Sequence, residues 1–223
     1  MRKIRLFLCA SAALFGCSLS LRGQEIETTQ VVDLGLSVKW AGYNIDASAP
    51  EQFGGYYAWG EIEEKGDKDY VIANYKWCKG TKDTLTKYCY DEYGLDGFRD
   101  DKRVLDPEDD VAHVKWGGSW HIPTQAQWTE LYQKAKWKYL TYNGTEGYRI
   151  TGPSGKSIFL PSGGVKTMLG YLRQGFAGSY YASTLDEISS YGCFGYYFYA
   201  GMRRPTIVGL LRECGRTVRA VCD

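Results

Sequence analysis

Several groups of residues in this 223-residue chain have types and spacings that could support chemistry. The segment GPSGKS (152–157) resembles the end of a phosphate-binding loop, but Ile150 stands where that loop requires its first glycine. His113 and His121 could act as general bases, yet the sequence pairs neither with a nucleophile. The chain has no G-x-S-x-G segment, no C-x-x-C pair and no cysteine–histidine set at zinc spacing. Carboxylates are numerous, but none is marked out as a glycosidase-like pair. We therefore expect a protein that is not an enzyme and holds no cofactor or metal.

The segment SSYGCFGYYFYAGMRRP (189–205) is the strongest candidate for a binding surface. With the strand period of two, one face has the composition of a core: Phe194, Tyr196, Phe198 and Ala200. The opposite face combines tyrosines with small residues: Tyr191, Cys193, Gly195, Tyr197 and Tyr199. Tyrosine and arginine are both enriched at binding hot spots. We predict that ligand is bound by Tyr181, Tyr191, Tyr197, Tyr199, Arg203 and Arg204. The alternative is that these tyrosines only line a crowded seam between strands and loops.

Residues 1–24 are typical of an export signal, because a basic start precedes an uncharged apolar run at 6–16 that is too short to span a bilayer. The letters LFGC resemble the lipobox of bacterial lipoproteins, which would make Cys17 the lipidated first residue of the mature chain. Cleavage after Gly23 is the alternative, and Cys17 is then an ordinary residue of the apolar run. We expect a cell-envelope protein, an outer-membrane lipoprotein or else a secreted or periplasmic one, that contacts membrane only through such a lipid.

The remaining residues, 25–223, have the length of a single domain. A net charge of +1 gives no strong attraction to nucleic acid or to an anionic membrane. Cys78 and Cys89 flank a ten-residue segment whose Lys-Gly-Thr start suits a turn, which makes a hairpin disulfide plausible. Residues 25–223 contain five cysteines, so at least one of these thiols stays unpaired.

The elements that must position these residues are of mixed type. Residues 31–45 predict one or two strands, and residues 70–106 predict a long irregular excursion. A helix is expected after Thr124, which with Gln127 forms a capping box; its apolar stripe comprises Trp128, Leu131, Tyr132 and Ala135. Asp106 is expected to cap a shorter helix, which accounts for the acidic segment without a metal. Short strands with glycine turns follow residue 140, so the class is α+β.

Six blocks of the chain together resemble a known family. They are VDLGLSVKWAGYNI, PEQFGGYYAWGE, LDPEDDVAHVKWGGSWHIPTQAQWTEL, GKSIFLPSGG, YYASTL and RECGRTVRAV, and they span about residues 31–221. Their order is similar to that of the Fibrobacter succinogenes major paralogous domain, which is common in exported proteins of Bacteroidetes. The resemblance implies a C-type-lectin-like α+β domain with paired terminal strands, two helices, small antiparallel sheets and long loops on one side.

The block WHIPTQAQW also resembles the formylglycine-generating-enzyme superfamily, which shares this fold. Three positions depart from the usual pattern of such families: His121, Gln127 and Tyr181 replace arginine, glutamate and tryptophan. The sulfatase-activating members bind copper through two close cysteines, whereas Cys214 and Cys222 are eight residues apart in a block that does not match. The motifs of calcium-dependent sugar binding are absent as well. The resemblance therefore carries over the fold and not the activity.

Together these observations predict an exported, non-catalytic binding or adhesion module whose partner is an extracellular protein or glycan. Two alternatives remain, an oxidase-like enzyme of the formylglycine-generating type and a structural subunit of the envelope or of an appendage. Similar scaffolds are also diversified by retroelements within the last fifty or so residues. In this chain the diversified part would be the tail from Tyr180 to Arg216.

Overall fold

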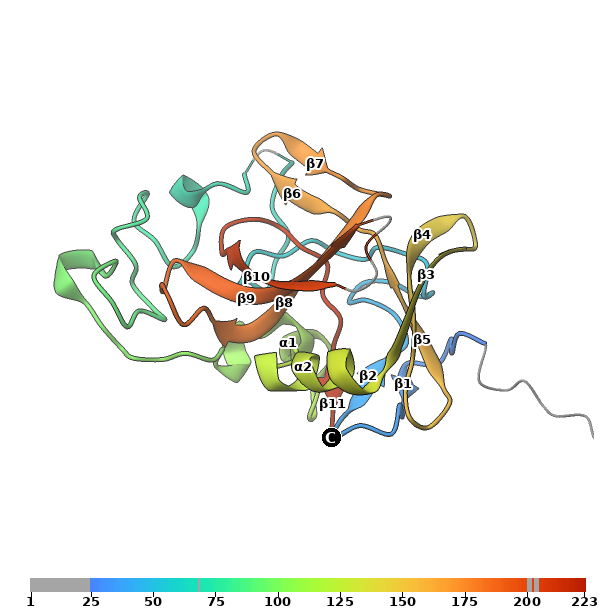
Figure 1. Ribbon diagram of the computed structural model, residues 1–223. Helices are drawn as coiled ribbons and strands as arrows, with labels where there is room; N and C mark the ends of the chain where they lie inside the picture. Colours follow the sequence, from blue (N-terminus) through green and yellow to red (C-terminus); the bar gives the residue numbers. More distant parts are fainter. Residues whose placement is uncertain (1–24, 68, 200–201, 203–204) are drawn as a thin grey trace, which may run out of the picture.

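The computed structural model describes residues 25–67, 69–199, 202 and 205–223. These residues form two α-helices, three short 3-10 helices and several small antiparallel sheets, which confirms the α+β class (Figure 1). The α-helices are α1 (Val111–Trp116) and α2 (Gln125–Lys134), and the 3-10 helices are Ile72–Asn74, Leu95–Gly97 and Pro107–Asp109. The strands are β1 (Val31–Val32), β2 (Lys39–Ala41), β3 (Lys136–Tyr142), β4 (Thr145–Thr151), β5 (Ser157–Pro161), β6 (Val165–Thr167), β7 (Gly170–Leu172), β8 (Ala177–Leu185), β9 (Gly192–Tyr199), β10 (Thr206–Leu211) and β11 (Val221–Cys222). None of the helices in this described part has the length and apolar character that a membrane crossing requires.

One small sheet joins segments from the two ends of the described chain. Its strand order is β1-β2-β11, in which Trp40 is paired with Val32 on one side and with Val221 on the other. The C-terminus therefore lies beside β2 (Figure 1). Both strands that residues 31–45 could have formed are present.

A second sheet has the order β3-β4-β5. The turn between β3 and β4 places Asn143 and Gly144 at φ 47° and 82°. Positive φ at both central residues is what a tight two-residue hairpin turn requires, and asparagine followed by glycine is the preferred pair. The segment GPSGKS lies at the turn between β4 and β5, where Gly155 has a φ of 85°.

Helix α2 begins and packs as predicted. The hydroxyl of Thr124 accepts a hydrogen bond from the Gln127 amide at 3.3 Å, and Gln127 Oε1 accepts one from the Thr124 amide at 2.8 Å. The Trp128 ring stacks on that of Tyr196 with centroids 4.9 Å apart, and its Nε1 donates to the carbonyl of Tyr181 at 3.0 Å. The apolar stripe of α2 therefore covers one face of the sheet that contains β8 and β9.

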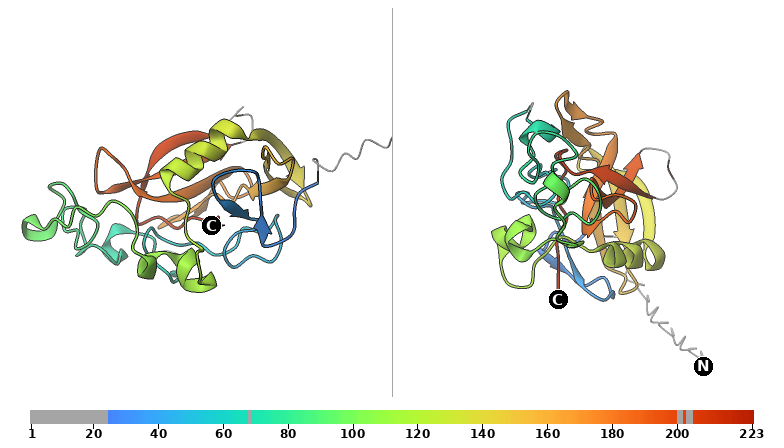
Figure 2. Two further views of the ribbon diagram at one scale, coloured as in Figure 1. Left: turned by 90° about the horizontal axis from the view of Figure 1, so that it is seen from below. Right: turned by 90° about the vertical axis from the view of Figure 1, so that its left-hand side faces the viewer.

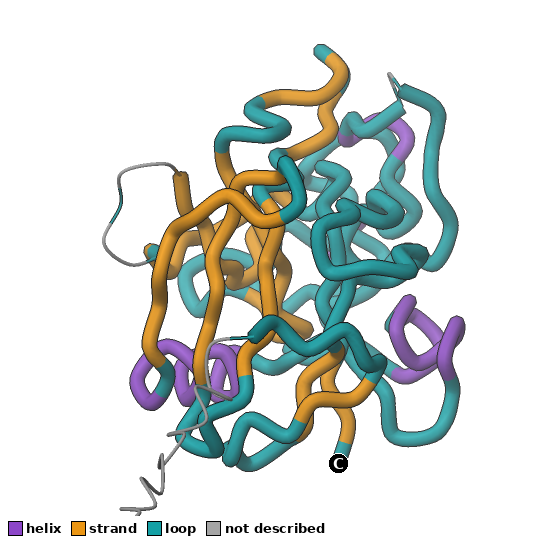
Figure 3. The backbone as a smooth tube through the Cα atoms, turned by 90° about the vertical axis from the view of Figure 1, so that its right-hand side faces the viewer, coloured by secondary structure: helices purple, strands orange, loops and turns teal. Residues whose placement is uncertain are grey.

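The third sheet, of order β10-β9-β8, is covered on both faces. One face joins α2 and the β3-β4-β5 sheet in a core that includes Tyr180, Ala182, Tyr196 and Phe198. The other face packs against loops and helix α1 in a second core that includes Trp59, Val111, Tyr181, Cys193 and Leu210. Figure 3 shows the strands gathered on one side of the molecule and the loops on the other. The loops, together with α1, thus decide how much of the second face stays exposed.

Residues 70–106 form the irregular excursion that the sequence predicted. Seen from below, the green end of this segment extends away from the sheets (Figure 2, left). Its inner residues are buried, notably Tyr75, Leu85 and Tyr88. These side chains anchor a segment that has almost no regular secondary structure.

The acidic segment before α1 differs from the prediction. Residues Pro107–Asp109 form a separate 3-10 helix, and Asp106 at its start makes no side-chain capping bond. Asp110 caps α1 instead, because its Oδ1 accepts hydrogen bonds from the amides of Ala112 and His113 at 2.9 and 3.2 Å. The carboxylate of Asp106 instead forms ion pairs with Lys87 and Lys102.

Candidate ligand-binding surface

Strand β9, which contains most of the predicted site, has one buried face and one mixed face. Tyr196 and Phe198 are 1% and 0% exposed, as the strand period predicted. On the other face Cys193 is fully buried, whereas Tyr199 is 45% exposed. The loops thus cover the first half of this face and leave the end of the strand open.

The open end of β9 forms part of an aromatic patch, which we define as Arg173, Phe176, Tyr197 and Tyr199. The register between β8 and β9 pairs Ala177 with Tyr199, which brings the preceding Phe176 next to this strand end. The rings of Tyr197 and Tyr199 have centroids 6.1 Å apart, and the guanidinium of Arg173 donates a hydrogen bond to the Tyr197 hydroxyl. Phe176 is 65% exposed, which is unusual for an aromatic hydrocarbon side chain.

A shallow depression of about 330 Å³ lies within the patch and is lined by Arg173, Phe176 and Tyr199. Its chemistry is that of a contact site, since aromatic rings supply apolar area while a guanidinium and a phenol supply hydrogen bonds. Neither Arg173 nor Phe176 was predicted from the sequence to belong to the site. The only local signal was a phenylalanine in the polar, glycine-containing turn RQGF, and the register that places it beside Tyr199 is not visible in the sequence.

Tyr181 is not part of any accessible surface, so its predicted role in binding is wrong. The side chain is 2% exposed, and the Arg216 guanidinium lies 4.8 Å from its ring. Its hydroxyl donates to the carbonyl of Cys214 at 2.6 Å and accepts from Arg216 Nη1 at 2.6 Å. Burial raises the pKa of this phenol well above its ordinary value. Tyr181 therefore holds the turn after β10 against β8.

Tyr191 precedes Tyr197, the nearest patch residue on β9, by six residues, or about 20 Å along an extended strand. Its half-buried ring lies 6.3 Å from that of Tyr93, and its hydroxyl donates to Glu213 Oε1 at 2.8 Å. Burial, together with the carboxylate acceptor, raises the pKa of this phenol. Of the predicted residues that the structure describes, Tyr197 and Tyr199 thus belong to the patch, whereas Tyr181 and Tyr191 do not.

Several predicted positions lie outside the described residues. They include Ala200, Arg203 and Arg204, which follow β9 in the sequence, and Cys17 in the N-terminal segment, while the side chain of Phe194 is likewise not described. The aromatic patch is accordingly defined without them.

The disulfide expected between Cys78 and Cys89 is not formed, and all five cysteines of the described part are free and buried. The hairpin in this segment is closed by a bridge between Cys78 and Leu85, with the thiol of Cys78 directed at the carbonyl of Thr81. Cys89 lies beyond that hairpin, where its thiol contacts Asp91 at 3.6 Å. The turn is therefore shorter than the spacing of the two cysteines suggested.

The remaining thiols do not have the environment of nucleophiles or metal ligands. Burial raises the pKa of Cys193, Cys214 and Cys222, which favours the neutral thiol over the reactive thiolate. His121 is held by Ser119 O at 2.9 Å and by Gln127 Oε1 at 3.3 Å, and neither of these partners is a nucleophile.

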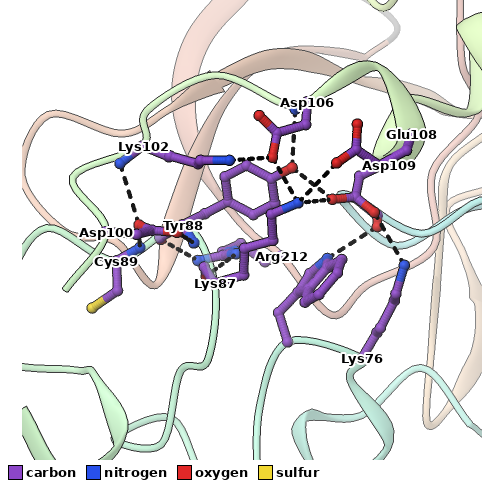
Figure 4. A network of polar contacts seen from close by, with 12 residues as sticks. Lys76, Lys87, Tyr88, Cys89, Asp100, Lys102, Asp106, Glu108, Asp109 and Arg212 are labelled. Atoms are coloured by element: carbon purple, nitrogen blue, oxygen red, sulfur yellow. Dashed lines mark hydrogen bonds and ion pairs between the residues drawn. The ribbon is translucent and has the colours of Figure 1, made fainter. Parts of the chain in front are cut away.

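The carboxylates of Asp106, Glu108 and Asp109 lie close enough together to suggest a metal site, but lysines neutralise them. The Nζ atom of Lys87 lies between the three, at 2.6, 3.6 and 2.6 Å respectively, as Figure 4 shows. Lys102 adds a contact of 2.6 Å to Asp106. Hydrogen bonds from Lys102 and Lys87 lower the pKa of Asp106. This cluster is an ion-pair network that fastens the loop excursion to the segment before α1.

Within the described residues, the aromatic patch is thus the part of the predicted site that the fold leaves open to a partner. Comparisons of the chain with protein-family models, with curated proteins and with solved structures found no match.

Proposed function

We propose that this chain is an exported, non-catalytic binding module whose aromatic patch contacts an extracellular protein or glycan. The observation that carries the proposal is the exposure of Phe176 and Tyr199, 65% and 45%, beside the guanidinium of Arg173 at the end of β9. Exposure of aromatic rings to water is unfavourable, and burying them in a contact with a partner lowers the free energy. Their clustering on the surface therefore favours recognition over a structural role.

The export part of the proposal rests on residues 1–24, whose basic start and apolar run are typical of a signal segment. Lipidation at Cys17 would tether the module to the cell envelope, and cleavage after Gly23 would release it. Either route places the aromatic patch outside the cytoplasm, where a surface protein or a glycan is accessible.

We further propose that the fold is C-type-lectin-like, of the kind found in the Fibrobacter succinogenes major paralogous domain. The pairing of β2 with both β1 and β11 supports this proposal, since terminal strands meet in such domains. The two short helices and the long loops gathered on one side of the molecule support it as well (Figure 3).

The proposed function is tested by probing an array of glycans and surface proteins with the purified chain and with two single variants, Phe176→Ala and Tyr199→Ala. We expect each variant to weaken binding to any ligand found by about tenfold or more, since hot-spot aromatics contribute on that scale. The free energy of unfolding should change by less than about 1 kcal/mol, because neither side chain is buried.

Phe98→Ala is the matched control, because Phe98 is also an exposed phenylalanine, 37%, but lies in the loop excursion. It should leave binding unchanged. Unaltered binding in both patch variants would show that the contact surface lies elsewhere, and unfolding of either variant would assign its ring to the core.

A further inference from the structure

A second pocket, which shares no lining residue with the aromatic patch, lies beside the hairpin of β6 and β7. Its volume is about 380 Å³, and its walls are mainly aliphatic: Ile72, Met168, Leu169, Leu172 and Leu211. Leu169 and Met168 at the hairpin tip are 76% and 60% exposed, and Leu211 at the end of β10 is 47% exposed. Three segments distant in the sequence thus expose apolar side chains around one hollow.

Glu213 also lines this pocket, and its side chain is 7% exposed. Its Oε1 accepts the hydrogen bond from the Tyr191 hydroxyl, but its Oε2 is buried without a hydrogen-bond partner. No ion pair joins Glu213 to any lysine or arginine of the described chain. A buried carboxylate oxygen without a donor is rare, because desolvation of the charge is left uncompensated.

The positively charged side chains close to Glu213 in the sequence or in the fold already have other partners. Arg212 donates to Tyr75 Oη at 3.0 Å and to the carbonyl of Ser190 at 2.7 Å. Arg216 donates to Ser179 Oγ at 2.8 Å and to the Tyr181 hydroxyl. Lys166 is paired with Asp67 at 3.0 Å. None of these side chains can donate a hydrogen bond to Glu213 Oε2 without losing its present partners.

We propose that this pocket binds a small organic cation whose ammonium group donates to the carboxylate of Glu213 and whose apolar body contacts the aliphatic walls. The complement of an unpaired buried carboxylate is a charged donor, and charge-assisted hydrogen bonds are the stronger kind. The exposed leucines and methionine complement an apolar body of similar size. This inference is independent of the aromatic patch and of the ligand that the patch would bind.

The test is a calorimetric titration of the purified full chain with 2-phenylethylammonium and, in parallel, with 2-phenylethanol, which has the same apolar body without the charge. The wild-type chain should bind the cation at least about tenfold more tightly than the alcohol, since only the cation supplies a charged donor. This comparison needs no variant, so it stands even where a substitution disturbs folding.

Glu213→Gln should weaken binding of the cation by about tenfold and leave binding of the alcohol unchanged. The glutamine amide keeps an acceptor for the Tyr191 hydroxyl but lacks the negative charge. Glu187→Gln is the matched control, since Glu187 is an exposed carboxylate outside the pocket, and it should change neither affinity. Leu169→Ala, at an exposed position in the pocket wall, should weaken binding of both probes by about threefold.

Three outcomes would overturn the proposal. They are equal affinity for the cation and the alcohol in the wild-type chain, equal affinity of Glu213→Gln and wild type for the cation, and the absence of saturable binding by either probe. Each of these outcomes leaves the proposed function of the aromatic patch untouched, because that surface is tested by different variants and a different measurement.

Discussion

The carboxylate of Asp109 is almost entirely buried, and its donors show why it is structural. Lys87 Nζ lies 2.6 Å from it, the Tyr88 hydroxyl donates to it at 2.7 Å, and Lys76 Nζ lies 3.1 Å away. Burial alone would raise the pKa of Asp109, but these three donors outweigh burial and lower it. We predict that Asp109→Asn lowers the free energy of unfolding by about 3 kcal/mol at neutral pH, because two lysines lose the charge that they share. Chemical denaturation measures this loss.

The same residue predicts a pH dependence with a defined sign. A carboxyl group whose pKa is lower in the folded chain contributes stability above the unfolded pKa, which is about 4 for aspartate. That contribution is lost as the pH falls through the folded pKa. The wild-type chain should therefore lose more stability than Asp109→Asn between about pH 5 and about pH 2. Parallel loss in the two chains would mean that the acid sensitivity comes from other carboxylates.

At the scale of elements, the start of α1 depends on Asp110 rather than on Asp106. Asp110 accepts the amides of Ala112 and His113 through Oδ1, and its Oδ2 accepts the amide of Ile122 at 2.7 Å. We predict that Asp110→Ala lowers the free energy of unfolding by about 3 kcal/mol, because three backbone donors lose their acceptor.

Asp106→Ala is the comparison for this prediction, and it should cost about 1 kcal/mol or less, since the partly exposed Asp106 contributes only ion pairs with lysines. Thermal unfolding of the two variants under one set of conditions decides the assignment. A larger loss from Asp106→Ala would restore the cap that the sequence suggested.

Elements defined by local interactions could be predicted from the sequence, and α2 is the clearest case. The capping box of Thr124 and Gln127 and the stripe from Trp128 lie within a few residues of one another, so their spacing alone specifies the helix. For β9 the period of two identified the buried face correctly. It could not specify the opposite face, because Cys193 is covered by loops from distant parts of the chain whereas Tyr199 is not. The burial of Tyr181 has the same non-local origin.

On the scale of the whole molecule, buried arginines from the C-terminal segment connect parts of the chain that are far apart in sequence. Arg212, Arg216 and Arg219 are 0%, 6% and 1% exposed. Their partners are mostly backbone carbonyls and hydroxyls, so each guanidinium satisfies several buried acceptors at once. The roles of these side chains could not be predicted from the sequence, because their partners lie up to 178 residues away. Irregular loops with few ladder hydrogen bonds need such donors.

Arg219 provides the sharpest test of this role, because it joins the terminal sheet to β5. Its Nε donates to Asn44 Oδ1 at 2.9 Å, its Nη1 to the carbonyl of Ala41 at 2.8 Å and its Nη2 to the carbonyl of Phe159 at 2.7 Å. Burial lowers its pKa to about 10, so the side chain stays protonated at neutral pH. We predict that Arg219→Met lowers the free energy of unfolding by about 3 kcal/mol, because three buried acceptors lose their donors.

Arg219→Lys should recover only a small part of that loss, since one ammonium cannot reproduce the planar fork that reaches three separated oxygens. Arg99→Met is the matched control, because Arg99 is exposed, and it should leave the unfolding free energy within about 0.5 kcal/mol of wild type. Full stability in Arg219→Met, measured by chemical denaturation, would mean that apolar packing alone holds the two sheets together. In that case the buried arginines would be tolerated by the fold rather than required by it.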